Sequence, residues 1–221
     1  MRYPVNEIFE TLQGEGRFTG MPAIFVRLQG CPVGCSWCDT KHTWEQNSED
    51  ERPLGDILVK TAASSCWAWA TPEAMLATFA ERGFNAKLVV ITGGEPCMFD
   101  LVPLCEALHS AGYSTQIETS GTFEINVPQE TVITLSPKVG MKGGYAILDS
   151  ALERADDIKH PVARERDIEE LDALLARCSS DKPVYLQPVS QGKRATELCI
   201  TTCIKRNWRL SVQLHKYLGI E

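Results

Sequence analysis

Three cysteines near the start of the chain have a spacing that suits a metal centre. Cys31, Cys35 and Cys38 form a C-x3-C-x2-C pattern on a Gly- and Pro-containing loop, directly after an apolar run at residues 23–28. Iron–sulfur clusters take Cys thiolates as ligands, usually four for a cubane cluster. Three thiolates would therefore leave one iron without a protein ligand, and an open iron can bind a substrate or cofactor and do chemistry.

A structural zinc site and a group of buried thiols are the alternatives to a cluster. A structural zinc needs four closed ligands, for which His42 or Cys97 would have to serve as the fourth. The aromatic residue Trp37, just before Cys38, has no role in a zinc site, and neither have the glycine motifs described next. The pattern therefore favours a cluster over zinc.

Three other unusual motifs each stand at the end of a predicted strand. They are G-G-E-P at 93–96, E-T-S-G at 118–121 and S-P-K at 136–138. Ligand sites in parallel sheets gather at the carboxyl ends of the strands, so we expect these motifs and the cysteine loop to share one site. In G-G-E-P, two glycines expose backbone groups and Glu95 supplies an acceptor, which together can hold an ammonium group.

Strands and helices are predicted to alternate throughout the chain. The apolar patterns predict strands at 3–11, 23–28, 87–92, 114–119, 132–135, 158–162, 184–188 and 209–215. They predict helices at 54–63, 72–82, 101–111, 146–155, 165–176 and 195–206. Thr71 and Pro72 are typical of an N-cap and a first helical position. Such alternation implies a parallel sheet with right-handed crossovers.

The length and composition are those of an ordinary folded domain. A chain of 221 residues is commonly one domain, and it is 43% hydrophobic and 23% charged. The first twenty residues include Glu7, Glu10 and Glu15 and resemble no signal peptide, so we expect a cytoplasmic protein that does not enter a membrane.

Net charge and cysteine content narrow the function classes. The formal charge of −7 argues against an extended nucleic-acid surface, which needs a basic face. Nine cysteines are an odd number in a chain without an export signal, which favours metal binding or buried thiols over a disulfide framework.

Taken together, the motifs resemble one known family. The residues that carry the resemblance are L-Q-G-E-G at 12–16, R-L-Q-G-C-P-V-G-C-S-W-C-D-T at 27–40, I-T-G-G-E-P at 91–96, I-E-T-S-G at 117–121 and S-P-K at 136–138. The cysteine pattern is similar to the signature of the radical S-adenosylmethionine (SAM) enzymes. The whole set resembles the 7-carboxy-7-deazaguanine synthases of queuosine biosynthesis. The resemblance covers residues 3–215 except 43–86, which we expect to be a family-variable insertion in a single radical SAM domain spanning 1–221.

The resemblance implies a fold, a reaction and partners. The fold is an α/β, partial and open TIM-like barrel of about six parallel strands with reduced helix content. The reaction is that of a carbon–nitrogen lyase, which converts 6-carboxy-5,6,7,8-tetrahydropterin to 7-carboxy-7-deazaguanine and releases ammonia. The cofactors are a [4Fe–4S] cluster, SAM and Mg²⁺. The partners are a second copy of the chain, as a homodimer, and an electron donor such as a flavodoxin.

The resemblance also assigns roles to individual positions. Cys31, Cys35 and Cys38 would hold the [4Fe–4S] cluster, and Thr40 would bind Mg²⁺. The expected SAM contacts are Trp37, Cys38, Asp39, Gly94, Glu95, Ser136, Pro137 and Lys138. The expected substrate contacts are Leu12, Gln13, Gly14, Glu15, Arg27, Thr92, His215 and the terminal carboxylate of Glu221. No side chain is expected to act as a general acid or base, because the protein supplies positioning and exclusion of water.

A radical SAM enzyme that acts on another target, such as a glycyl-radical activase, is the rival within the same chemistry. The L-Q-G-E-G segment and Thr40 favour the pterin enzyme.

Overall fold

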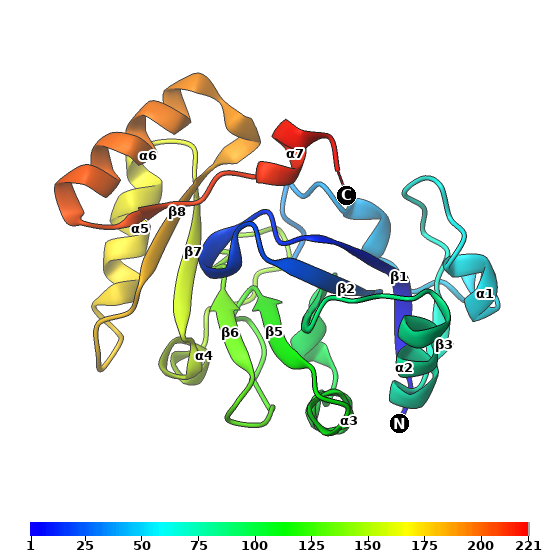
Figure 1. Ribbon diagram of the computed structural model, residues 1–221. Coiled ribbons are helices and arrows are strands. Elements are labelled where there is room, and N and C mark those ends of the chain that lie inside the picture. Colours follow the sequence, from blue (N-terminus) through cyan, green and yellow to red (C-terminus); the bar gives the residue numbers. More distant parts are fainter. Residues whose placement is uncertain (221) are drawn as a thin grey trace.

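In a computed structural model, which describes residues 1–220, nine strands form one open sheet in the order β3-β1-β2-β4-β5-β6-β7-β8-β9 (Figure 1). The strands are β1 (Tyr3–Leu12), β2 (Pro22–Leu28), β3 (Ala68–Ala70), β4 (Leu88–Gly93), β5 (Ser114–Thr119), β6 (Val132–Leu135), β7 (Asp157–Val162), β8 (Val184–Pro188) and β9 (Arg209–Leu210). β1 is antiparallel to β2 and β3, and the pairs from β2 through β9 are parallel. The predicted open α/β architecture is confirmed, and its parallel part is slightly wider than the resemblance implied.

The helices lie around the outside of the sheet. They are α1 (Leu54–Ile57), α2 (Pro72–Glu81), α3 (Val102–Ser110), α4 (Asp149–Arg154), α5 (Glu165–Leu175), α6 (Lys193–Arg206) and α7 (Leu214–Leu218). Short 3-10 helices lie at Gly16–Phe18, Lys41–Thr43, Ser48–Asp50, Pro96–Met98 and Val189–Gln191. α3 packs on β5, α4 on β6, α5 on β7 and α6 on β8 (Figure 1), which leaves the opposite face of these strands to form the site.

The strands bury apolar side chains on both faces where the sequence is a continuous apolar run. On β4, Val89 and Ile91 belong to the main core beneath the helices, while Leu88 and Val90 pack with Ala23 in a separate cluster. This is the behaviour of an interior strand in a parallel sheet. On β5 and β7 the two faces differ: Ile117 and Ile158 enter the apolar cores, while Glu118 and Lys159 line a cavity.

Three of the predicted elements are wrong in extent. The helix predicted at 54–63 ends at Ile57, the only buried residue of α1, so little apolar surface stabilises a longer helix. The chain turns instead, and Lys60 Nζ donates to Asn6 Oδ1 and to the carbonyl of Cys66, both at 3.1 Å. The helix predicted at 146–155 begins only at Asp149.

The third error concerns the strand predicted at 209–215. β9 ends at Leu210 and α7 begins at Leu214, because the Ser211 and Gln213 side chains and Leu214 N bond to the loop after β1. The predicted βα alternation also fails twice: β1 connects to β2, and β5 to β6, without an α-helix between them.

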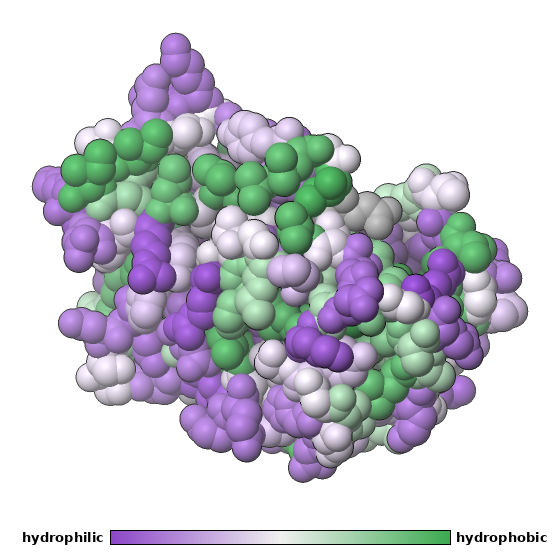
Figure 2. All heavy atoms as spheres, viewed as in Figure 1, coloured by the Kyte–Doolittle hydropathy of each residue, from purple (hydrophilic) through white to green (hydrophobic). Residues whose placement is uncertain are grey.

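The surface seen in Figure 2 is mixed, with apolar atoms gathered along α6 and beside α7. The exposed apolar side chains of these helices include Ile200, Ile204 and Leu218, and such exposure is common on folded domains. In residues 1–220, no helix combines the length and apolar character needed to cross a membrane.

His160 on β7 is buried as a neutral side chain. It is 3% exposed, its Nε2 bonds the carbonyl of Asp167 at 2.9 Å, and its Nδ1 has no hydrogen-bond partner among residues 1–220. Burial lowers the pKa of His160 from 6.5 to about 4.

As the pH falls from 6.5 to 4, the unfolded chain binds a proton at this imidazole before the folded chain does, so the free energy of unfolding decreases. The variant His160→Asn should lose this component, which amounts to at most about 3 kcal/mol. Urea unfolding at a series of pH values measures it. The stability of wild type should fall more steeply than that of the variant between pH 6.5 and 4.5. His109→Asn, at a half-buried histidine, is the control, and parallel slopes for wild type and His160→Asn would contradict the assignment.

Candidate active site

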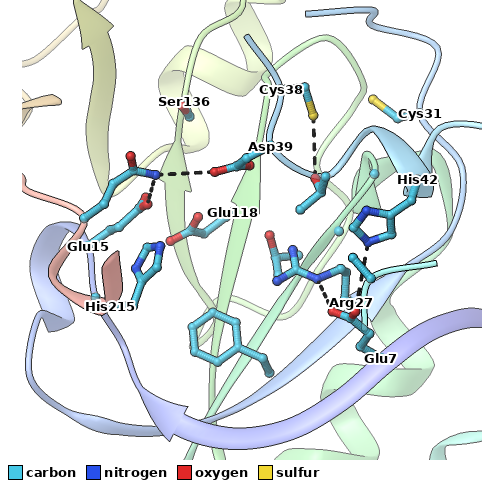
Figure 3. Close-up of a pocket in the computed structure, with 18 of the residues that line it drawn as sticks. Glu7, Glu15, Arg27, Cys31, Cys38, Asp39, His42, Glu118, Ser136 and His215 are labelled. Atoms are coloured by element: carbon cyan, nitrogen blue, oxygen red, sulfur yellow. Dashed lines mark hydrogen bonds and ion pairs between the residues drawn. The ribbon is translucent and has the colours of Figure 1, made fainter. Parts of the chain in front are cut away.

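One large cavity of about 1030 Å³ lies where the strand ends meet. Side chains of the loop after β1, the cysteine loop and the ends of β4 to β7 face it, together with residues near α7 (Figure 3). Every site residue predicted from the sequence lines this cavity except Pro137 and Glu221. Glu221 lies outside the described residues. The structure therefore brings together motifs that are spread over most of the chain.

Gly93 and Gly94 allow the end of β4 to approach the cysteine loop. Gly94 N donates to Leu28 O at 2.9 Å and Glu95 N donates to Gly30 O at 2.8 Å. A Cβ on Gly94 would lie 2.0 Å from Gly30 O, and one on Gly93 would lie 2.3 Å from Leu28 N. Gly93 also has a φ of 122°, which favours glycine. Both glycines are therefore required by backbone packing.

The Glu95 carboxylate connects two of the motif loops. It is 1% exposed. Its Oε1 accepts from Cys97 N (3.0 Å) and the Thr119 hydroxyl (2.6 Å), and its Oε2 accepts from the backbone N (2.8 Å) and hydroxyl (2.5 Å) of Ser120. These four donors occupy the usual acceptor sites of a carboxylate. An ammonium group would reach Glu95 only by taking the place of one of the hydroxyls.

The three clustered cysteines are free thiols on one wall of the cavity. Cys38 N donates to Cys35 O at 3.1 Å, and Cys38 Sγ accepts from Trp44 Nε1 at 3.4 Å. Thr40 Oγ1 lies 3.6 Å from the same sulfur. Burial raises the pKa of the Cys31 thiol to about 11.

Within residues 1–220, no three Cys, His, Asp or Glu side chains are grouped so that they could hold a single metal ion. A cluster takes its thiolates on different irons, so its ligands need not meet at one atom. Three soft sulfur donors on one wall, with an N–H directed at one of them, fit an iron–sulfur cluster.

Arg27 is held at the opposite side of the cavity. Its Nε donates to Glu7 Oε2 at 2.8 Å, and its guanidinium lies 5.9 Å from the Phe9 ring centroid. Thr92 is its neighbour on β4. His42 Nε2 is 4.0 Å from Glu7 Oε1 (Figure 3). This arrangement fixes a cation that can bind a carboxylate.

The segment before and within α7 joins the loop after β1 to the cysteine loop. Gln213 Nε2 donates to Glu15 Oε1 (3.1 Å) and to Asp39 Oδ2 (3.5 Å), and Lys216 Nζ donates to the same Asp39 oxygen (3.2 Å) (Figure 3). A Cβ on Gly14 would lie 2.4 Å from His215 Nδ1. Hydrogen bonds therefore connect the predicted substrate contact Glu15 with the predicted SAM contact Asp39.

The S-P-K motif contributes a half-buried lysine. Lys138 Nζ donates to the backbone carbonyl and hydroxyl of Ser136 at 2.8 and 2.5 Å. Burial lowers the pKa of Lys138. Ser136 and Lys138 line the cavity, whereas Pro137 is not among its lining residues.

Among the cavity residues to which the sequence-based prediction gave no individual role are Glu118, Lys159 and Gln213. Lys159 Nζ lies between Glu15 and Glu118. Glu118 stands in the E-T-S-G motif, and a charged residue beside Ile158 in a predicted strand is the sequence signal that could have found Lys159. Gln213 carries no such signal.

Gly94→Ala should push the G-G-E-P loop away from the cysteine loop, because the new Cβ would collide with Gly30 O. We expect the free energy of unfolding to fall by about 1–3 kcal/mol and turnover to fall about 100-fold, the cost of a misplacement near 1 Å. Chemical unfolding and a turnover assay measure the two effects.

The matched control is Gly55→Ala, since nothing lies within 4 Å of a Cβ at that position. It should behave as wild type in both measurements. Wild-type turnover in Gly94→Ala would show that the two loops tolerate a wider separation.

Comparisons with known proteins found close relatives, although no protein-family model matches the chain. The chain is 60% identical over 222 residues to the 7-carboxy-7-deazaguanine synthase of Escherichia coli K12, with all of both chains covered. It is 45% identical to that of Buchnera aphidicola, again with all of both chains covered. The crystal structure of QueE from Escherichia coli superposes with a TM-score of 0.95 at 58% identity, covering 97% of this chain and 95% of that one.

Proposed function

The chain belongs to the 7-carboxy-7-deazaguanine synthase family, and from that membership we propose how its cavity carries out the family's reaction. The enzyme acts in queuosine biosynthesis as a lyase that converts 6-carboxy-5,6,7,8-tetrahydropterin to 7-carboxy-7-deazaguanine and releases ammonia. The observation that supports this site is the convergence of the cysteine loop and three strand-end motifs on one cavity.

Cys31, Cys35 and Cys38 would hold a [4Fe–4S] cluster beside the residues that contact SAM. When bound, the cluster and SAM would supply radical chemistry at the substrate. The Trp44 indole, which donates to Cys38 Sγ, stabilises negative charge on that sulfur.

SAM is held by backbone and side chains around the same wall. Trp37, Cys38 and Asp39 in the cysteine loop, Gly94 and Glu95 in G-G-E-P, and Ser136, Pro137 and Lys138 in S-P-K are its proposed contacts. Glu95 contributes chiefly by fixing the G-G-E-P loop to Thr119 and Ser120.

The pterin lies between Arg27 and the loop after β1. Arg27 binds the substrate carboxylate through the guanidinium nitrogens that do not contact Glu7. Its further proposed contacts are Leu12, Gln13, Gly14, Glu15, Thr92, His215 and the terminal carboxylate of Glu221. Thr40 would hold Mg²⁺ through its hydroxyl, a hard oxygen donor of the kind this ion takes.

The protein's own contribution is to orient the substrate and to exclude water. Gln213 and Lys216 close one side of the cavity over Glu15 and Asp39, so the reacting groups are held in a fixed relation. The proposal includes a homodimer in the cytoplasm, reduced by an electron donor such as a flavodoxin. A single radical SAM domain with a family-variable segment at 43–86 also remains a prediction.

Anaerobic reconstitution followed by a turnover assay tests this function. Wild-type protein should bind about four irons per chain and form 7-carboxy-7-deazaguanine from the carboxy-tetrahydropterin. One zinc without iron or sulfide would support a zinc-binding module, and an intact cluster without this product would support a radical enzyme with another target.

Cys35→Ala should lose the cluster and all detectable turnover, because one of three thiolate ligands is gone, while its circular dichroism stays that of a folded protein. Cys178→Ala is the control, since Cys178 Sγ donates to the carbonyl of Leu174 at 3.8 Å and the residue lies outside the cavity lining. It should retain iron and activity. Product formation by Cys35→Ala would refute the assigned cluster ligands.

A further inference from the structure

Lys159 is a buried lysine that faces the cavity between two carboxylates. Its side chain is 4% exposed, and its Nζ lies 2.5 Å from Glu15 Oε2 and 2.8 Å from Glu118 Oε2. Lys159 lies on β7, Glu15 lies in the loop after β1, and Glu118 lies on β5. A buried ammonium with two carboxylate partners is a specific arrangement, because each ion would be costly to bury alone.

The two carboxylates retain acceptor capacity toward the cavity. Glu15 Oε1 accepts from Gln213 Nε2 and Glu118 Oε1 accepts from Gln13 Nε2, both at 3.1 Å, while their Oε2 atoms bond Lys159. Each oxygen therefore receives one of the two hydrogen bonds it can accept. Two carboxylates and one ammonium also leave one negative charge uncompensated within this cluster.

We propose that Lys159 is a positioning residue that holds Glu15 and Glu118 as a pair of ionised acceptors for the N–H donors of the substrate's pterin ring. This inference rests on the proposed function. The exocyclic amine and neighbouring ring N–H of a pterin form a donor edge, and a carboxylate binds such an edge with two parallel hydrogen bonds. A site that satisfies its buried acceptors with these donors rejects ligands that lack them.

The ammonium favours the ionised form of Glu15 and compensates the charge of Glu118 beside it. Although burial opposes it, Lys159 lowers the pKa of Glu15 to about 2, and the two carboxylates raise the pKa of Lys159 against its own burial. Without the lysine, two neighbouring half-buried carboxylates would repel each other, and the pair would take up a proton more readily. A protonated carboxyl group accepts fewer hydrogen bonds, so the ring would bind less tightly.

The other charged groups near this cluster do not replace Lys159. Lys138 from the loop after β6 is engaged by Ser136. Asp157, also on β7, pairs with Arg17 at 2.8 Å. His215 from α7 faces Glu15 and supplies a smaller interaction than Lys159 does.

The test measures the KM for the carboxy-tetrahydropterin and kcat between pH 6 and 9 in reconstituted holoenzyme. Wild type should show a KM that is independent of pH. Lys159→Met should raise KM about 10- to 100-fold, the effect of weakened hydrogen bonds to charged acceptors, with a further rise as the pH falls. SAM affinity should stay within about threefold of wild type, since SAM occupies the other side of the site.

Two matched variants separate positioning from folding. Lys159→Arg keeps the cation, so its KM should stay independent of pH. Lys205→Met removes an exposed lysine on α6 and should leave KM unchanged. The double variant Lys159→Met/Glu118→Gln lacks the carboxylate repulsion, so it should fold and lose the acid-dependent rise while KM stays high. If Lys159→Met alone does not fold, the double variant tests the proposed role of Lys159.

A pH-independent, wild-type KM in Lys159→Met would overturn the inference, as would a wild-type KM in the double variant. A variant that only melts at lower temperature, with KM unchanged, would show a structural role alone. Wild-type turnover in the same assay keeps the two proposals apart. Turnover with an unaffected Lys159→Met refutes only the lysine's role, whereas absent wild-type turnover refutes the proposed function itself.

Discussion

The close approach of the β4 end to the cysteine loop is the constraint on which the rest of the site depends. Gly94 N and Glu95 N donate to the backbone carbonyls of Leu28 and Gly30. There is no room for a side chain at Gly93 or at Gly94. Glu95 then carries the connection to β5 through Thr119 and Ser120. The cysteine loop, the G-G-E-P loop and the E-T-S-G segment therefore take their relative positions from the backbone contact at Gly93 and Gly94.

The two faces of the sheet follow different physical rules. On β5 and β7, Ile117 and Ile158 enter the apolar cores against the helices, while Glu118 and Lys159 point the other way into the cavity. The polar face is sustained because its charges are paired within hydrogen-bonding distance. Ion pairs thus stabilise the charged side chains on the cavity face of the sheet, although the chain as a whole is acidic.

Much of this arrangement could be predicted from the sequence where local signals were strong. β5, β6 and β8 have the predicted limits; β6 and β8 are compact, largely apolar runs. α2 begins as expected because Thr71 accepts from Ala74 N. The limits of the other elements depend on contacts between segments that are far apart in the sequence. These contacts end α1 at Ile57 and β9 at Leu210, which a one-dimensional pattern does not record. The strand-end motifs were sufficient to predict one shared cavity. The role of Lys159 depends on Glu15 and Glu118, which lie far from it in the sequence.

The contacts made by residues 211–216 also bear on the order in which the molecule forms. Gly16 N bonds the Ser211 hydroxyl across 195 residues of sequence, and Gln213 reaches Glu15 across 198. Contacts of such sequence separation carry a large loop-closure entropy and slow the folding of a domain. We therefore expect the contacts between the two ends of the chain to form after the local helix contacts. Until they form, Asp39 in the cysteine loop lacks its hydrogen bonds from Gln213 and Lys216.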